Sequence, residues 1–371
     1  MSSSTLSRTF SLINGPQTLG NSRRFWLAFL LVLAAVLIYP VFAESYDVGN
    51  MAYLLIWVFM AMGLCLVWGY GGMLSFGQTF FFGIAGYGYG VLAINFGGEG
   101  LTTFAALLLA VGLSALAALV LGYFVIWGQV AGVFFGIVTL SATLVLAFFL
   151  GQTAGPEWHI GEARLNGFNG MKDMQPLNLP WNGEAFYFEG TSLYYLVIGL
   201  ILVVYVGLRV LLNSRFGNVV VASREDPQRA ELLGYDVRKY QLGTFVIGSA
   251  LAGLTGALYT SWGQFITPAS IGLPAAAMPI VWVAFSGRSD ITATLVGSFL
   301  VLWAFQAITV YSQQIALILM GAMLLASVII APQGFVIGMV RAVRRVVGGR
   351  RAGAGGAAGA SSGSIAEGSK P

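Results

Sequence analysis

Charged side chains are scarce in this chain. Only 9% of its 371 residues are Asp, Glu, Lys or Arg, whereas 57% are hydrophobic. Soluble globular domains carry roughly 25% charged residues. Residues 100–156 and 240–287 contain no charged residue at all, and runs of that length are typical of membrane spans, because a bilayer core needs roughly 20 apolar residues per helix. The composition predicts a polytopic membrane protein whose fold class is all-α, a single transmembrane helical bundle.

Side chains for catalysis and metal binding are almost absent as well. Cys65 is the only cysteine and His159 the only histidine, which excludes a disulfide or a cysteine cluster and argues against a histidine-rich metal site. None of the three lysines follows a glycine, so the phosphate-binding pattern GxxxxGK[ST] cannot occur. We therefore expect no catalytic residue, no metal and no cofactor in this chain. Any energy from ATP would have to come from another chain.

The predicted spans also lack ionisable groups. Apart from Arg209 at the end of one span, none contains Asp, Glu, Lys, Arg or His. Proton-coupled transporters usually bury such a group, so its absence argues against proton coupling. A sodium site built from carbonyl and hydroxyl oxygens is still compatible with the sequence. An ion-coupled secondary transporter is therefore one hypothesis to keep.

Apolar runs predict about ten spans. They are Phe25–Ala43, Ala52–Trp68, Leu74–Ile94, Phe104–Trp127, Val133–Leu150, Leu193–Leu212, Leu242–Trp262, a short Ala275–Phe285, Ile291–Tyr311 and Ile315–Ile330. The first run also imitates a twin-arginine signal peptide, but an uncleaved anchor helix is the favoured interpretation because the chain remains polytopic after it.

The distribution of basic residues predicts the orientation. With the amino terminus in the cytoplasm, sixteen of the eighteen Lys and Arg residues fall on the cytoplasmic side, and only Arg164 and Lys172 fall outside. This asymmetry satisfies the positive-inside rule. An even number of spans then places both termini in the cytoplasm. The basic residues cluster at span ends, where anionic lipid explains the net charge of +4 better than nucleic acid does.

Three regions follow from these runs. Residues 1–24 are predicted to be a disordered cytoplasmic segment, residues 25–338 the transmembrane domain, and residues 339–371 a cytoplasmic tail, first basic and then rich in Gly, Ala and Ser. Residues 158–190 form the one sizeable outside loop, and residues 213–239 a cytoplasmic loop.

The densest charge lies in Arg209–Lys239, which we call the charged island. Ten of the 32 charged residues of the chain fall within these 31 positions. One interpretation is a solvated face beside lipid headgroups. The other is an aqueous loop that docks on another protein.

Two polar stretches at membrane depth are candidates for a translocation path. The stretch from Gly69 to Gln78 is dense in glycine and contains Ser75 as well as Gln78. Glycine there permits either close helix packing or a broken helix with free backbone groups. Thr139 and Thr143 are four residues apart and share one face of the fifth predicted span. Threonine hydroxyls in membrane helices also commonly bond to their own backbone.

In this order and spacing, several stretches resemble the permease subunits of branched-chain amino acid ABC importers, including their urea and amide relatives. Gly69–Gln78 is similar to the family's GYxGxLSxGxxxFFGxGAY, and residues 132–140 to its GVYFAIxTLA. Residues 214–259 are similar to its SxFGRxxxAxREDxxxAxxLGYxVxxYKLxxFxxSAxxAGxAGALY, and Pro332–Phe335 to its closing PKG pattern. The resemblance covers residues 53–338.

The resemblance implies a pore subunit that is not an enzyme and that imports a small neutral or zwitterionic solute across a bacterial inner membrane. Branched-chain amino acids come first, with urea or a short amide as the alternative. The implied partners are a second, homologous permease, two cytoplasmic ATPases that bind ATP, and a periplasmic solute-binding protein. Part of the charged island would form the coupling helix on the ATPase, with the expected contact residues Arg224, Glu225, Asp226, Arg229, Ala230 and Gly234.

The chain departs from the family pattern at one turn. The family's GGRGT appears here as Ser286–Asp290, with two glycines lost. We expect the fold to survive this change, but the assignment to a close subfamily and its solute is weakened by it.

Overall fold

The computed structural model of the chain describes residues 13–18, 20–97, 102–181 and 184–330, together with residues 334 and 338. The predicted tail at 339–371, most of the predicted amino-terminal segment and three residues of the Pro332–Phe335 motif lie outside the described residues.

Helices account for most of the described chain. Those that cross the bundle are α2 (Arg23–Phe42), α3 (Ser45–Leu64) continued by the π-helix η1 (Cys65–Tyr70), α4 (Gln78–Phe96), α5 (Thr102–Trp127), α6 (Val133–Gly151), α7 (Thr191–Asn213), α10 (Val237–Gly263), α11 (Leu273–Ser286), α12 (Ile291–Thr309) and α13 (Gln313–Ile330). Among the described residues, nine helical segments are long and apolar enough to span a membrane. The all-α transmembrane bundle predicted from the sequence is thereby confirmed, and α13 corresponds to the tenth predicted span.

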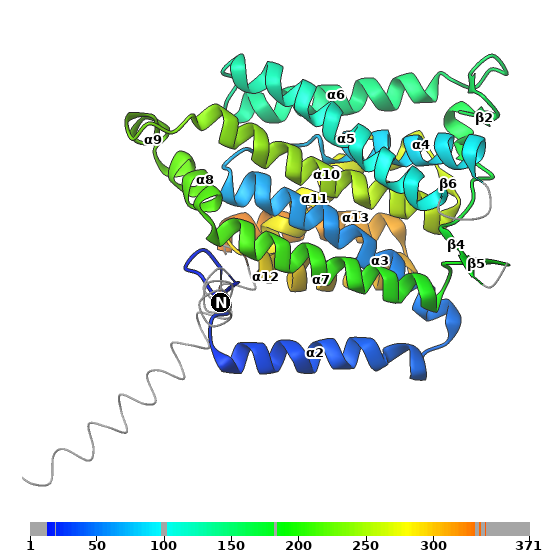
Figure 1. The fold of residues 1–371 in the computed structure, drawn as a ribbon, viewed down its shortest axis with the longest axis horizontal. Coiled ribbons are helices and arrows are strands. Elements are labelled where there is room, and N and C mark those ends of the chain that lie inside the picture. The colour runs from blue at the N-terminus through cyan, green and yellow to red at the C-terminus, as the bar shows by residue number, and fades with distance from the viewer. Residues whose placement is uncertain are drawn as a thin grey trace, which may run out of the picture.

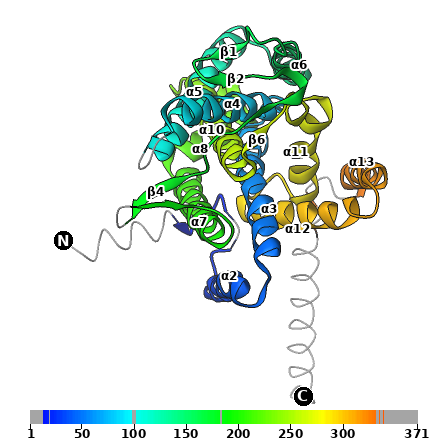
Figure 2. The same cartoon turned by 90° about the vertical axis from the view of Figure 1, so that its right-hand side faces the viewer.

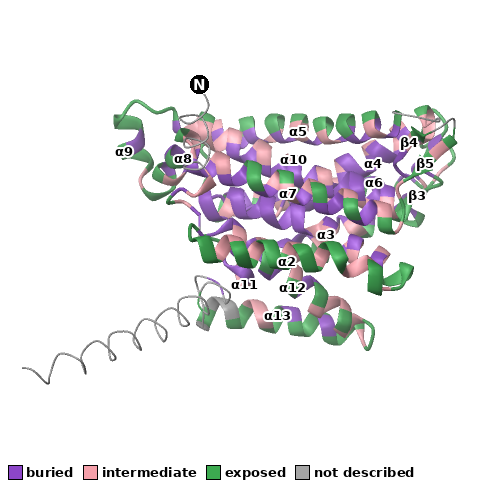
Figure 3. Cartoon of the chain, turned by 60° about the horizontal axis from the view of Figure 1, so that its bottom comes forward, coloured by how far each residue is buried: buried purple, intermediate pink, exposed green. Residues whose placement is uncertain are grey.

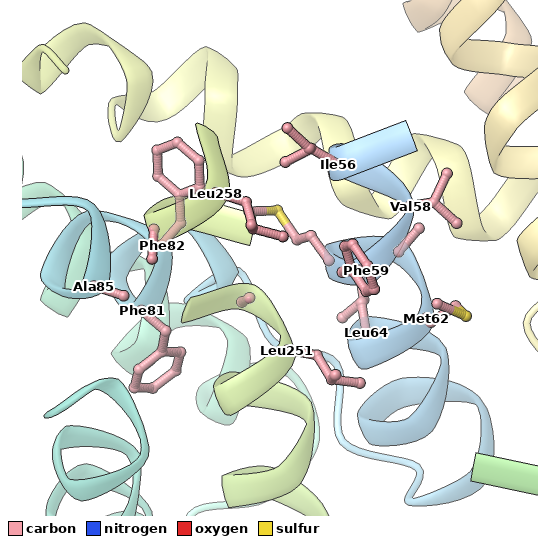
Figure 4. Close-up of a cluster of buried hydrophobic side chains, with 14 of the residues drawn as sticks. Ile56, Val58, Phe59, Met62, Leu64, Phe81, Phe82, Ala85, Leu251 and Leu258 are labelled. Atoms are coloured by element: carbon pink, nitrogen blue, oxygen red, sulfur yellow. The ribbon is translucent and has the colours of Figure 1, made fainter. Parts of the chain in front are cut away.

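Helix α10 lies at the centre of the bundle, where it packs against α3, α4 and α5. Glycines permit this close approach: a Cβ atom at Gly256 would lie 2.0 Å from the carbonyl oxygen of Phe82, and one at Gly63 would lie 2.4 Å from that of Gly248. The core around these contacts is aliphatic and aromatic, and includes Phe59, Phe82 and Leu258 (Figure 4).

The outer faces of the bundle are apolar too. Figure 3 shows exposed residues along α2 and α5, and many of these are leucine, valine or phenylalanine. Apolar residues that are exposed along whole helices would be unfavourable in water, but they match the hydrocarbon of a bilayer.

The two ends of the bundle differ in structure. Three two-stranded antiparallel sheets lie at one end and pair β1 (His159–Ile160) with β2 (Ala163–Arg164), β4 (Asn178–Trp181) with β5 (Glu184–Tyr187), and β3 (Met171–Lys172) with β6 (Phe265–Ile266). Two short helices, α8 (Arg215–Glu225) and α9 (Pro227–Leu232), lie at the opposite end (Figure 1). The predicted outside loop and the charged island are thus on opposite sides, as a membrane topology requires.

Candidate functional site

The chain between α3 and α4 is not helical at residues 71–77, which we call the linker segment. The π-helix η1 widens the last turn before it, with Gly71 N donating to Leu66 O at 3.0 Å. Gly72 then adopts a φ of +74°, which glycine reaches without strain. The predicted third span, Leu74–Ile94, therefore starts only at Gln78, and the amides of Phe76 and Gly77 donate to side-chain hydroxyls rather than to helical carbonyls.

Three of the four predicted path residues hold this linker segment in place. Thr139 Oγ1 accepts from Phe76 N at 3.1 Å, and Thr143 Oγ1 donates to Phe76 O at 3.3 Å. Ser75 Oγ accepts from Gly77 N at 3.1 Å. All three side chains are buried, and both threonines also bond to carbonyls of their own helix. The structure thus brings these three predicted residues together, and their hydroxyl groups form hydrogen bonds with the backbone.

Gln78, the fourth of them, is different. Its side chain is fully buried, and neither Nε2 nor Oε1 has a hydrogen-bond partner. A buried polar group without a partner costs about 1–3 kcal/mol. An amide offers donors and an acceptor at once, so Gln78 can bind a neutral polar molecule where the broken helix begins.

The middle of the charged island forms α8 and α9, while its two ends belong to α7 and α10. Asp226 separates the two helices: its side chain accepts from Arg229 N at 3.0 Å and caps α9, and Pro227 follows at the first helical position. The side chains of Asp226 and Arg229 also form an ion pair at 3.4 Å. The sequence pattern that suggested a single coupling helix therefore forms two helices with a turn at Asp226.

Helix α9 presents an exposed surface beyond the end of the bundle (Figure 1). Ala230 is buried beneath it, whereas Leu232 and Leu233 are 88% and 71% exposed. Gly234 ends the turn with a φ of +88°, and a Cβ atom there would meet nothing within 4 Å. Two exposed leucines beside Arg229, in a loop outside the predicted spans, form a surface suited to a protein partner. The sequence analysis missed these leucines, although two adjacent leucines in a charged loop were a usable signal.

Arg224 connects the charged island to the linker segment. Its guanidinium group donates to the carbonyl oxygen of Gly69, the last glycine of η1, and its aliphatic part lies against Gly72. It also forms an ion pair with its neighbour Glu225. The side chain is 32% exposed, so Arg224 contacts its own chain on one side. Helix α8 is thereby fixed to the start of the linker segment.

A second arginine holds the amino-terminal segment at the same end. Arg209 is fully buried, and its guanidinium group donates to Tyr205 Oη at 2.8 Å, Thr292 Oγ1 at 3.3 Å and Asn21 Oδ1 at 3.4 Å. Its Nε atom donates to Ile13 O at 3.0 Å. The group also lies over the rings of Phe25, Trp26 and Tyr205, an arrangement that stabilises a cation away from water.

Residues 17 and 18 also contact η1, α7 and α8. Gln17 accepts from Tyr70 Oη at 3.0 Å, and its side chain donates to Asn218 of α8 at 3.3 Å. Asn213 donates to Thr18 at 3.1 Å. The sequence showed only that Arg209 lies at the end of a span. Its contacts could not be predicted, because its partners lie up to 196 positions away.

The altered turn Ser286–Asp290 lies beside the same site. Asp290 caps α12 by accepting from Thr292 N at 2.8 Å and from Ala293 N at 2.9 Å. The Arg288 guanidinium lies 5.2 Å from the ring centre of Trp68. A Cβ atom at Gly69 would lie 1.7 Å from Arg288 O. The turn therefore packs directly on η1, next to the contact of Arg224.

Among the ionisable residues of the described ranges, no group of three or more His, Cys, Asp or Glu could hold a metal ion. Asp236 at the start of α10 has a lowered pKa, chiefly because Lys239 donates a hydrogen bond to its carboxylate. Asp236 also accepts from Lys239 N and so caps α10, and the pair lies at the surface.

Comparisons with known proteins identify the family of the chain. The family described as "Branched-chain amino acid transport system / permease component" matches residues 48–328. The high-affinity branched-chain amino acid transport system permease protein LivM of Escherichia coli K12 is 24% identical over 324 residues, which cover 84% of this chain and 74% of that protein. A probable branched-chain amino acid transport permease protein LivH of Methanocaldococcus jannaschii is 32% identical over 154 residues, 38% of this chain and 44% of that protein.

No solved structure matches the chain. The family match spans well over half of the 371 residues and includes the linker segment and the charged island. The chain is thus a multi-pass membrane protein that belongs to the family of branched-chain amino acid transport permease components.

Proposed function

We propose that this chain is the pore subunit of an ATP-binding cassette importer and carries a small net-neutral solute across a bacterial inner membrane. A homologous second permease, two cytoplasmic ATPases and a periplasmic solute-binding protein complete the assembly. ATP is bound by the ATPases, and this chain supplies no catalytic group. Both termini and α9 are cytoplasmic, with residues 158–190 outside.

The observation that carries this proposal is the contact of Arg224 with Gly69. It joins α8, and α9 beyond it, to η1, which directly precedes the linker segment. A loop that only solvates a membrane surface has no need of such a contact. A loop that receives force from an ATPase has to pass it on to the pore.

The mechanism follows from the chain of contacts. ATP-driven closure of the ATPases displaces α9 and, through it, α8. Arg224 then pulls on η1 and on residues 71–77, which are bonded to Thr139 and Thr143 of α6. Displacement of the linker segment from α6 exposes Gln78 and opens a path on one side of the membrane.

The solute is proposed from the chemistry of this path. Ser75, Gln78, Thr139 and Thr143 are all uncharged, and the described spans offer no carboxylate or ammonium that would pair with a net charge away from the ends of the bundle. A zwitterionic branched-chain amino acid fits, in line with the names of the relatives. Urea or a short amide would use the same groups, and competition between labelled leucine and urea for uptake separates the two.

Two changes in the charged island test the coupling role. Glu225→Ala combined with Asp226→Ala removes the ion pairs and the cap of α9. Gly234→Val forces a β-branched residue into a positive φ, which costs about 1–3 kcal/mol. We expect both variants to reach the membrane at normal abundance, with sharply reduced solute uptake and reduced co-purification of the ATPase.

Matched controls exclude a general effect of charge or bulk. Glu157→Ala combined with Glu184→Ala removes two exposed acids at the opposite end of the bundle. Gly49→Val adds the same side chain to a helical glycine with nothing within 4 Å of its Cβ position. Both controls should transport normally. Normal uptake with an intact complex in the two test variants would return the charged island to the role of a solvated face.

A further inference from the structure

Helix α2 lies along the outside of the bundle (Figures 1 and 2), where Leu33, Val36 and Tyr39 pack against a small apolar cluster. No residue of α2 is buried. Pro40 lacks an N–H group, so it leaves the carbonyl of Val36 without its helical donor, and Tyr194 Oη donates to that oxygen at 2.7 Å. Towards the other end, the ring of Phe29 stacks on Tyr205 at 5.5 Å.

A groove lies between these two attachments. Its volume is about 430 Å³, and its walls come from α2, α3, α7 and α12. Aliphatic, methionine and aromatic side chains make up the whole lining, including Val32, Ala35, Ile201 and Phe299. The helices that line it are all candidate membrane spans, so the groove lies at the depth of the hydrocarbon.

The size of the groove selects its occupant. A cavity of about 150 Å³ holds benzene, with six carbons, so a groove of about 430 Å³ takes roughly 17 carbons by the same ratio. One acyl chain of a phospholipid therefore fits.

The charge at one end of the groove selects the headgroup. Arg23 and Arg24 are exposed in the first turn of α2, where no acidic residue lies. They are five and six residues before Phe29, or about 8–9 Å along the helix. An anionic phosphate at the membrane surface lies within reach of both long side chains, and anionic lipids are concentrated in the cytoplasmic leaflet.

We propose that the groove between α2 and the bundle binds one anionic phospholipid, with an acyl chain along Val32 and Ala35 and its phosphate at Arg23 and Arg24. Filling the groove restores the dispersion contacts that an empty apolar space would forfeit. The bound lipid acts as a spacer that keeps α2 attached. This binding does not depend on the transported solute or on an ATPase.

Native mass spectrometry of the purified full-length chain tests this site, with phosphatidylglycerol and phosphatidylcholine of the same acyl chains as probes. We expect one phosphatidylglycerol to be retained at least fivefold more strongly than phosphatidylcholine, since each basic residue near the surface contributes about fivefold. Arg23→Gln combined with Arg24→Gln should remove the preference. Arg164→Gln, which changes an exposed arginine at the opposite end, should leave it unchanged.

A pair of neighbouring alanines tests the groove itself. Ala35 lines it and Ala34 does not, so Ala35→Trp should abolish retention whereas Ala34→Trp should keep it. Equal retention in these two variants, or equal retention of the two lipids by the wild type, would overturn the proposal. If Ala35→Trp does not accumulate, a photoactivatable phosphatidylglycerol should label wild-type Val32 and Ile201, and labelling confined to other helices would contradict the proposal.

Cross-linking within the complete transporter tests whether a helix of the homologous permease occupies the groove instead of a lipid. A cysteine at Val32 should form no cross-link to the homologous permease, because the lipid occupies the groove. An efficient cross-link to that subunit would show that a protein covers this face and would refute the lipid site.

Discussion

Replacing Arg224 with methionine tests how force crosses from the charged island into the pore. Methionine keeps an unbranched apolar side chain against Gly72 but removes the donor to Gly69 O. Hydrogen bonds from charged groups contribute about 1.5–3 kcal/mol, and because the side chain is 32% exposed the low end applies. The ion pair to Glu225 is exposed and adds about 0–1 kcal/mol.

A loss of about 1.5 kcal/mol corresponds to roughly a tenfold shift between the attached and detached states of α8. We therefore expect Arg224→Met to lower the rate of solute uptake about tenfold. The ATPase should still co-purify with the permease, because Leu232 and Leu233 of the exposed surface are unchanged. Hydrolysis should continue without transport.

The assay is uptake into membrane vesicles together with ATP hydrolysis, at matched permease abundance. Arg215→Met is the control, since Arg215 is an exposed arginine at the start of the same helix, and it should transport normally. Wild-type uptake by Arg224→Met would refute the transmission through Gly69. Loss of the ATPase from the complex would refute it as well, because Arg224 would then be a docking residue.

Three further changes have defined outcomes. Gly69→Ala places a Cβ atom 1.7 Å from Arg288 O, and overpacking of this kind costs about 1–3 kcal/mol. The melting temperature in detergent should therefore fall. An unchanged melting temperature would contradict the packing of the altered turn on η1. Asp226→Ala removes the cap of α9 at a cost of about 1 kcal/mol. This change should weaken ATPase co-purification and leave the melting temperature unchanged. Undiminished co-purification would argue against α9 as the docking helix. Arg209→Met removes charged hydrogen bonds at about 1.5 kcal/mol each and should expose residues 13–21 to limited proteolysis; continued protection would show that Arg209 does not hold them.

The sequence predicted the helical spans well because each is a long apolar run. The short predicted span Ala275–Phe285, for example, corresponds to α11 at Leu273–Ser286. The predicted start of the third span at Leu74 was wrong, because the glycines of Gly69–Gln78 are compatible with either a continuous or a broken helix and the structure has no helix at residues 71–77. That conformation depends on Thr139 and Thr143, more than 60 positions further on.

The sequence predicted which residues belong to the candidate site, but not which contacts those residues make. The charged island stood out by charge alone, but charge does not reveal that Arg224 points back to Gly69 or that Asp226 divides two helices. The four path residues were chosen for polarity, and the structure separates Gln78 from the others by the absence of a partner. The short sheets at the far end were also missed, because strands of two to four residues have no periodicity that a sequence can show.

Energy dependence is the most direct test of the central claim that this chain is a pore driven by a partner ATPase. The measurement is uptake of labelled leucine into proteoliposomes that contain the complete complex with its solute-binding protein, with and without ATP on the ATPase side, and with ionophores that collapse proton and sodium gradients. We predict uptake that requires ATP and is unaffected by the ionophores. Uptake by this chain alone, driven by an ion gradient without ATP, would contradict the account and identify a secondary transporter.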